Sequence, residues 1–251
     1  MAEITVFGFP HTSFVHIVQL VLTHKEVPYT FHDLEPDMGS PKHLALHPFD
    51  RVPILKHGDF VLYETSAIVA YLEEQFPTPS LQPDTPQDRA RMNQWISAVN
   101  SYYYQYMIYH VGHERNVFPR LGIPSDEKVV AHALPKIEVG LQVVERQLSH
   151  GQGFLLGDEV TLADYYLLPS TFSFSRTDEG KAMYRSYPVF SSWRERMEAL
   201  SAVERLRRAT ADLPPIEHAR KWPRLAPAQI RQRYCQVSLA GVCTTLRTWL
   251  C

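Results

Sequence analysis

Cysteine is absent from the first 234 of the 251 residues, and its three copies, Cys235, Cys243 and Cys251, lie in the last 17. The body of the chain therefore has neither a disulfide framework nor a CxxC redox pair. The eight-residue spacing of the three cysteines fits neither a zinc finger nor a prenylation box. Any thiol chemistry in the body must use a thiol that a ligand supplies.

Long hydrophobic runs and an excess of charge of one sign are also missing. No stretch reaches the roughly 18 apolar residues of a membrane-spanning helix, and no basic segment precedes an apolar one at the N-terminus. We therefore expect a cytoplasmic protein without a membrane span. The formal net charge of −2 gives no reason to expect binding to nucleic acid. A hydrophobic content of 45% is enough for a packed core.

The first 80 residues alternate between short extended and helical patterns. Residues 3–9 predict a strand, the next residues up to Lys25 a helix, and residues 27–32 a second strand. After a polar loop over residues 33–42, a hairpin is predicted over residues 52–63 and an amphipathic helix over residues 66–76. This order predicts an α/β domain over residues 1–80.

A proline-rich stretch separates this domain from helical patterns. Four prolines between Pro77 and Pro86, with no helical period, indicate a linker, which we place at residues 81–87. An all-helical domain is then expected over residues 88–212. Its predicted helices span residues 89–111, 126–149, 161–174 and 188–208.

The end of the chain differs in charge from the rest. Residues 213–251 hold six Lys or Arg and one acid, which gives them a formal charge of +5. Because the net charge of the chain is −2, the other residues together carry −7. We interpret them as a basic C-terminal extension of unknown role.

Three segments carry a family resemblance, in this order along the chain: residues 47–55 (HPFDRVPIL), 63–68 (YETSAI) and 154–164 (FLLGDEVTLAD). Together they resemble the glutathione transferase family, and residues 126–130 and 143–149 are similar to its phi class. The resemblance covers residues 3 to about 208. It implies a thioredoxin-like glutathione-binding domain, a helical bundle holding the acceptor site, and a homodimer.

The resemblance also implies a glutathione site. In the family the second proline of the first segment is cis, and the residue before it offers its backbone to the ligand; here these are Pro53 and Val52. Proline keeps Val52 extended, so its N–H and C=O can pair with a short peptide. Glu64 can pair with the ammonium group of glutathione, and Thr65 at a helix start can receive the γ-glutamyl carboxylate. Without the resemblance, a hairpin proline and a helix cap would explain the same residues.

One departure from the phi class affects the glycyl end of the ligand. The family usually carries a His-Lys pair before the Pro-Phe segment, where this chain has residues 38–40 (MGS). Arg51 replaces the usual glutamine, and we expect its charge to contribute there instead.

Four histidines near this region suggest a metal hypothesis: His11, His16, His43 and His47. The i,i+4 pair, His43 and His47, lies directly before Pro48, where a helix should end. No carboxylate is clearly placed to complete the site, so no metal is predicted.

Activation of the glutathione thiol needs a group that stabilises the thiolate, because a thiol with a pKa of about 8.5 is mostly protonated at neutral pH. A hydroxyl of Thr12 or Ser13 and the positive end of the following helix are candidates, together lowering the thiol pKa by about one or two units. Counting back from residues 22–25, which resemble the end of the family's first helix, aligns Thr12 with the phi-class serine. Ser13 is the second choice, and both residues also fit an ordinary helix cap.

An acceptor pocket is expected against the helix that begins near Arg89, because its sequence is rich in tyrosine. At α-helical spacing about half of the aromatic side chains should pack inward and the others should line the pocket. The candidates for the lining are Tyr103, Tyr106, His110 and Phe118.

Residues 161–164 (TLAD) match a helix N-cap followed three positions later by an acid, with Val160 as a hydrophobic staple. We interpret this motif as structural, with no catalytic role.

The predicted function is conjugation of glutathione to small, largely apolar electrophiles, as in detoxification. Two alternatives stay open at this point. The same fold and thiolate can serve peroxide reduction, dehalogenation or isomerisation. The protein can also be a non-catalytic carrier of ligands.

Overall fold

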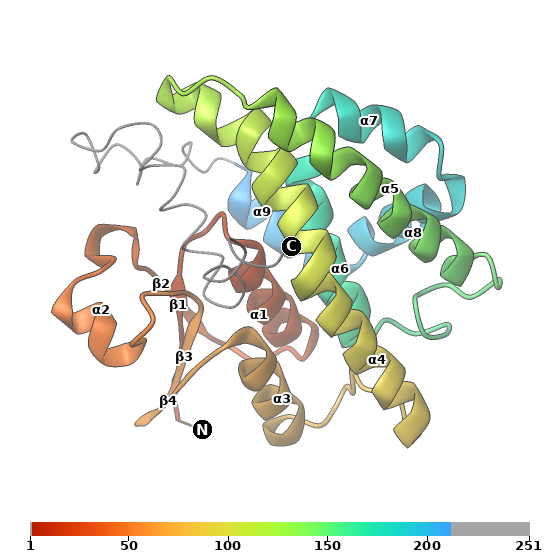
Figure 1. The fold of residues 1–251 in the computed structure, drawn as a ribbon. Helices are drawn as coiled ribbons and strands as arrows, with labels where there is room; N and C mark the ends of the chain where they lie inside the picture. Colours follow the sequence, from red (N-terminus) through yellow and green to blue (C-terminus); the bar gives the residue numbers. More distant parts are fainter. Residues whose placement is uncertain (1, 212–251) are drawn as a thin grey trace, which may run out of the picture.

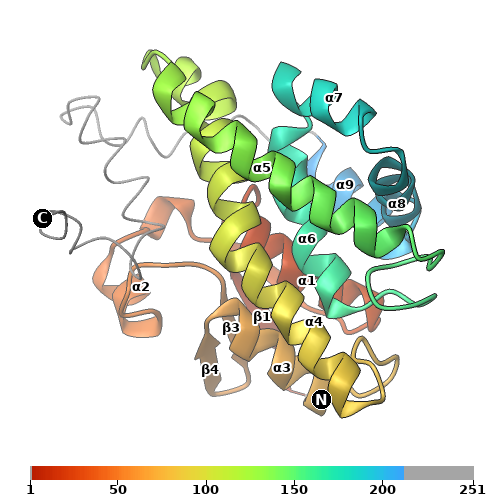
Figure 2. The same cartoon turned by 45° about the vertical axis from the view of Figure 1, so that its right-hand side comes forward.

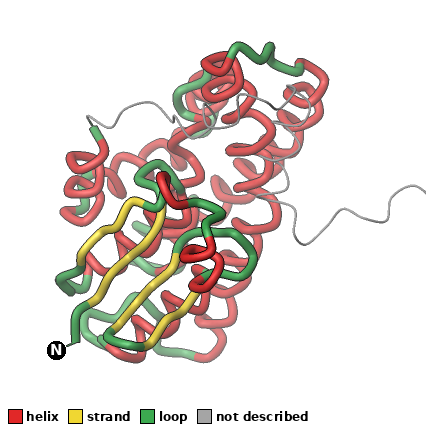
Figure 3. The backbone as a smooth tube through the Cα atoms, turned by 90° about the vertical axis from the view of Figure 1, so that its left-hand side faces the viewer, coloured by secondary structure: helices red, strands yellow, loops and turns green. Residues whose placement is uncertain are grey.

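Residues 2–211 are described by the computed structural model, and they form a small sheet region beside a larger group of helices (Figure 1). The sheet has the strand order β2-β1-β3-β4. β1 (Ile4–Gly8) pairs in parallel with β2 (Thr30–Asp33), whereas β3 (Ile54–His57) is antiparallel to β1 and to β4 (Phe60–Tyr63). Figure 3 shows the four strands side by side. The predicted βαβ unit and hairpin are confirmed, and the domain is thioredoxin-like.

Two helices pack against each other beside the sheet. α1 (Ser13–His24) connects β1 to β2, and α3 (Thr65–Gln75) follows β4. α1 is buried along most of its length, from Val15 to Leu22, because the sheet domain lies on one side of it and helices of the second domain on the other. A helix that is apolar all round is expected in such a position.

A buried ion pair joins α1 and α3 to the linker. Lys25 Nζ lies 2.8 Å from Glu73 Oε1, and it also donates hydrogen bonds to the carbonyls of Phe76 at 2.8 Å and Pro79 at 2.6 Å. Glu73 in turn accepts a hydrogen bond from the Leu81 N–H. Since a buried charge is costly unless it is paired and hydrogen-bonded, these contacts hold the start of the linker in place.

The helical domain begins with α4 and continues into a π-helical segment, η2. Its elements are α4 (Pro86–Ala98), η2 (Val99–Val117), the 3-10 turn η3 (Phe118–Leu121), α5 (Glu127–Leu148), α6 (Leu162–Phe174), α7 (Asp178–Arg185), α8 (Pro188–Glu198) and α9 (Ser201–Thr210). Figure 2 shows α5 lying along η2, and α6 packs against both α1 and η2. Within residues 2–211, no helix is long and apolar enough to cross a membrane.

The N-cap predicted at residues 161–164 is confirmed as a capping box. Asp164 is fully buried and accepts hydrogen bonds from the N–H groups of Leu155 and Thr161, both at 3.0 Å, and from Trp193 Nε1 at 2.9 Å. The Thr161 hydroxyl donates a further bond to the same carboxylate at 3.0 Å. The motif therefore organises the start of α6 around a satisfied buried acid.

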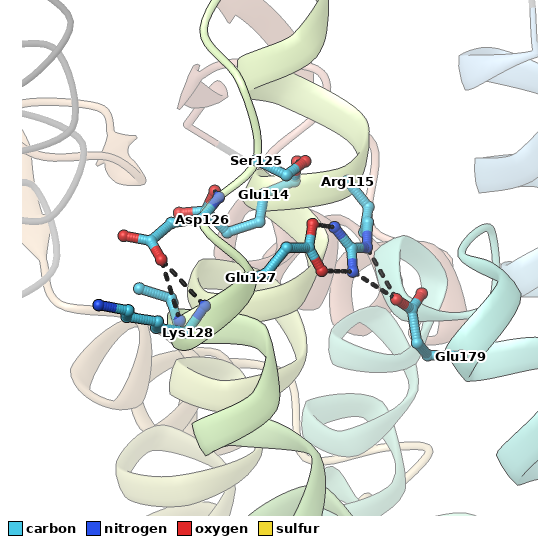
Figure 4. Close-up of polar contacts among 8 residues, drawn as sticks. Glu114, Arg115, Ser125, Asp126, Glu127, Lys128 and Glu179 are labelled. Carbon is cyan, nitrogen blue, oxygen red and sulfur yellow. Dashed lines mark hydrogen bonds and ion pairs between the residues drawn. The ribbon is translucent and has the colours of Figure 1, made fainter.

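Arg115 links η2 to α5 and α7 through hydrogen bonds (Figure 4). Its guanidinium donates two parallel hydrogen bonds to Glu127 at the start of α5, at 2.6 and 2.8 Å, and a further one to Glu179 on α7 at 2.8 Å. These carboxylates, Glu127 foremost, raise the pKa of Arg115. Buried Glu114 beside it accepts a hydrogen bond from the Asp126 N–H at 2.7 Å.

Several predicted elements differ from those observed. The expected polar loop at residues 33–42 contains the 3-10 turn η1 (Glu35–Asp37) and the first residues of α2 (Pro41–Leu46). The single helix expected over residues 188–208 is two, because α8 ends at Glu198 and Leu200 is extended. α7 was not predicted, although its N-cap Thr177 accepts a hydrogen bond from the Gly180 N–H.

Candidate functional site

A cavity of about 910 Å³ opens between the two domains. On one side it is lined by the start of α1, the loop before β3 and the start of α3. On the other side it is lined by η2, α6 and α9. Two helix N-termini therefore open on one space, and each presents N–H groups without an intrahelical partner and a positive end of its dipole.

Both predicted hydroxyls line this cavity, but their surroundings differ. Ser13 is buried, and its hydroxyl donates a hydrogen bond to the carbonyl of Pro169 on α6 at 3.2 Å. Thr12 is the extended N-cap of α1, and its side chain makes no capping hydrogen bond to the helix. The hydroxyl of Thr12 is therefore better placed than that of Ser13 to donate to a ligand.

The loop before β3 contributes Arg51, Val52 and Pro53 to the lining, and the Val52–Pro53 peptide bond is cis. His43 supports this loop, since its Nε2–H donates to the Arg51 carbonyl at 2.9 Å and its Nδ1 accepts from the Gly39 N–H at 3.2 Å. The loop is thus held with Val52 facing the cavity.

Glu64 and Thr65 line the cavity at the start of α3. Glu64 is an exposed N-cap with φ of 70°, a left-handed value that costs a residue with a side chain about 1–3 kcal/mol and is common at functional sites. Thr65 is buried as the first residue of the helix. Their positions put a carboxylate and a helix N-terminus side by side.

His16 and His47, which the metal hypothesis considered, also line the cavity. Burial lowers the pKa of His16 to about 4, and its Nε2–H donates to the Pro10 carbonyl at 2.7 Å. Burial also lowers the pKa of His47 to about 4, and its ring packs at a tilt on Tyr63 with centroids 4.6 Å apart. Both imidazoles are therefore neutral at physiological pH. Within residues 2–211, no group of three or more His, Cys, Asp or Glu side chains is close enough to hold a metal.

The four residues predicted for the acceptor pocket are not among those that line this cavity. Tyr103 is buried against α5, where its hydroxyl donates to the Gly140 carbonyl at 2.9 Å and burial raises its pKa. Tyr106 and His110 lie near His132 of α5. Phe118 is 3% exposed and packs on His113.

The π-helical geometry of η2 explains why other side chains of this segment line the cavity. Five of the η2 residues that line the cavity recur every four or five positions: Asn100, Tyr104, Tyr109, His113 and Val117. The other four are next to them in the sequence: Ser101, Gln105, Ile108 and Asn116. The prediction assumed α-helical spacing, in which a face recurs every three or four positions. An i→i+5 hydrogen-bond pattern adds a residue to each turn and therefore moves a different set of side chains onto the cavity side.

An aromatic wall results on this side. The Tyr104 ring lies 4.3 Å from that of Phe14 on α1 and 5.1 Å from that of Tyr109, measured between centroids. Tyr109 makes an edge contact with His113 at 4.8 Å. Burial, with Tyr109 next to it, raises the pKa of Tyr104 well above its ordinary value, so the Tyr104 phenol is neutral.

Both domains of the chain match models of known protein domains. Residues 6–80 match the model of the glutathione S-transferase N-terminal domain, and residues 102–201 match that of the C-terminal domain. A probable glutathione S-transferase, GSTF1, of Oryza sativa is 30% identical over 82% of this chain and 96% of its own length.

Solved structures agree in fold. Glutathione transferase F2 of Populus trichocarpa is 24% identical, covers 84% of this chain over all of its own, and has a TM-score of 0.77. Maize glutathione S-transferase I, in complex with an atrazine glutathione conjugate, is 24% identical, covers 85% of this chain and all of its own, and has a TM-score of 0.76.

Proposed function

Because this chain belongs to the glutathione S-transferase family, with phi-like relatives, we propose that it joins the thiol of glutathione to small electrophiles held in the cavity. One observation carries the proposal: Thr12, the Val52–Pro53 loop and the start of α3 line the same cavity as the aromatic wall of η2. A thiol bound on one side would therefore lie beside an electrophile bound on the other. Such proximity turns a bimolecular reaction into an effectively intramolecular one.

Glutathione would bind along the sheet-domain wall. The Val52 backbone is suited to pair with the cysteinyl residue, and Glu64 to bind the free ammonium group. The N–H groups at the start of α3, with the Thr65 hydroxyl, suit the γ-glutamyl carboxylate, since a helix N-terminus favours an anion. Arg51 supplies positive charge near the glycyl end.

The thiol would then lie at the start of α1. There the Thr12 hydroxyl donates a hydrogen bond to the sulfur, and the α1 dipole stabilises its negative charge. The thiol proton leaves to solvent, and the thiolate attacks an electrophilic carbon whose leaving group departs with the bonding electrons. Ser13 serves the interface with α6 through its bond to the Pro169 carbonyl.

The electrophile would pack against Tyr104, Tyr109 and Phe172, which replace the four residues expected from the sequence. Flat, polarisable groups suit these rings. The maize relative, which binds a glutathione conjugate of atrazine, supports an aromatic acceptor at this place.

Conjugation of glutathione to 1-chloro-2,4-dinitrobenzene, followed by absorbance, tests the proposal. We expect saturable catalysis that Glu64→Ala weakens through a higher KM for glutathione. Glutathione binding without conjugation of this or other electrophiles would favour a carrier. Reduction of cumene hydroperoxide with no conjugation would favour the peroxidase alternative.

The homodimer, the cytoplasmic location and the detoxifying role expected from the sequence are further parts of this proposal. Light scattering after size-exclusion chromatography should give twice the chain mass of 28.9 kDa. A monomer at micromolar concentration would contradict the dimer without affecting the proposed chemistry.

A further inference from the structure

Three arginines from separate elements line the cavity on the helical side. Arg120 lies in η3, Arg176 in the turn between α6 and α7, and Arg207 on α9. All three are exposed residues, so they form part of its mouth. The Arg207 guanidinium lies over the buried Phe172 ring, 4.8 Å from its centroid, and this contact holds one charge against an aromatic surface inside the cavity.

The ion pairs formed among residues 2–211 do not include these three arginines. Arg115, only five residues before Arg120, shows the contrast, because Glu127 and Glu179 both bind its guanidinium (Figure 4). Glu127 and Glu179 are thus directed to Arg115, whereas Arg120, Arg176 and Arg207 line the cavity.

Charge is distributed unequally between the two walls. The acids that line the cavity, Glu35, Asp50 and Glu64, all belong to the sheet domain, and the described residues of the helical domain contribute no acid to its lining. Burial, with the nearby charges of Arg207 and Arg120, lowers the pKa of Arg176. Like charges gathered without a counter-charge repel one another, and a bound anion relieves that repulsion.

We infer that the electrophiles of this site carry an anionic group, a carboxylate, sulfonate or phosphate, which Arg120, Arg176 and Arg207 bind at the mouth. The aromatic part of the same molecule packs on Phe172, and its reacting carbon points toward Thr12. Arginine suits this role, because its planar fork binds such oxygens with two parallel hydrogen bonds. The inference rests on the proposed function and specifies its substrate class.

A matched pair of electrophiles tests the inference: 4-chloro-3,5-dinitrobenzoate and its methyl ester. In both, the thiolate sulfur bonds to the carbon that carries chlorine, and chloride leaves with the bonding electrons. Each enzymatic kcat/KM is divided by the uncatalysed rate constant, which removes the intrinsic difference in reactivity. The ratio of carboxylate to ester then measures recognition of the charge alone.

We expect a ratio of about tenfold at low salt, falling in about 0.5 M NaCl because exposed charges are screened. Arg176→Gln and Arg120→Gln should each lower the ratio about threefold or more. Arg205→Gln is the control, because it removes the same charge from α9. Arg205 is exposed and does not line the cavity. A ratio near one in the parent protein, or an equal fall in Arg205→Gln, would overturn the inference.

A binding measurement separates this inference from the proposed function. The fluorescence of 8-anilinonaphthalene-1-sulfonate reports an anionic aromatic ligand, and N-phenyl-1-naphthylamine is its neutral analogue. If Arg176→Gln weakens only the sulfonate, the anion site stands even when neither electrophile is conjugated. If the ester is conjugated and both dyes bind the variant as they bind the parent, the proposed function stands and the inference fails.

Discussion

The two walls of the cavity are built from different kinds of structural element. On the sheet-domain wall, short loops and helix starts present Thr12, Val52 and Glu64 to the cavity. On the helical wall, the side chains come from the long η2 segment and from arginines far apart in sequence. The geometry of a loop motif is determined by a few neighbouring residues. Which side chains share one face of a helix depends instead on the number of residues per turn.

The largest expected effect is on the free energy of unfolding, and it tests the packing of α1 against α6. His16 lies on α1 and its ring lies 6.3 Å from Phe172 of α6, between centroids. Its folded pKa of about 4 is below the ordinary 6.5, so the unfolded chain takes up a proton first as pH falls. The free energy of unfolding should therefore drop by up to about 3 kcal/mol between pH 6.5 and pH 4 through this residue.

Urea unfolding at several pH values checks this prediction. His16→Gln should flatten the dependence in that window, whereas His150→Gln, an exposed control, should leave it as in the parent. If the His16→Gln curve keeps the parent slope, the histidine is not held neutral between the domains.

The next effect tests the glutathione wall. Glu64→Gln removes the charge proposed to bind the ammonium group, and a hydrogen bond to a charged partner is worth about 1.5–3 kcal/mol, so the Kd for glutathione should rise roughly 10- to 100-fold. Glu74→Gln removes an exposed charge from the same helix away from the cavity and should change the Kd little. Titration calorimetry measures both, and equal affinities in the two variants would remove Glu64 from the site.

The smallest effect compares two faces of η2. Tyr109→Leu should raise the KM for an aryl halide about fivefold, equivalent to about 1 kcal/mol of lost aromatic contact. Tyr106→Leu alters a side chain that packs near His110 and His132, so it should leave this KM near the parent value. The reverse result would restore the α-helical assignment made from the sequence.

These comparisons show what the sequence could predict. The strand pattern and the capping box at Thr161 follow from local chemistry, because a few neighbouring residues determine each. The cis bond before Pro53 was expected only from the family resemblance. The π-helical repeat of η2 has no comparable local signal, so Tyr104 and Tyr109 were missed. The arginines at the mouth of the cavity were not predicted for another reason. Arg176 and Arg207 come together only when α6 and α9 pack around the sheet domain, and no sequence motif indicates that packing.

The acceptor side could still have been approached from composition. The stretch between Asn100 and His113 is dense in tyrosine, which indicated an aromatic pocket, although the residues chosen from it do not line the cavity. Two of the histidines considered for a metal make other contacts: His43 donates a hydrogen bond to the Arg51 carbonyl, and the His47 ring packs on Tyr63.

The central claim is that the cavity binds glutathione as a thiolate activated by Thr12, and absorbance titration of bound glutathione near 240 nm tests it most directly. In Thr12→Val the pKa of the bound thiol should rise by about one to two units, because a hydrogen bond to a charged acceptor is lost. Ser13→Ala should shift it much less, since the Ser13 hydroxyl is directed to the Pro169 carbonyl. A titration that neither substitution moves would contradict the claim and show that the protein binds glutathione without activating it.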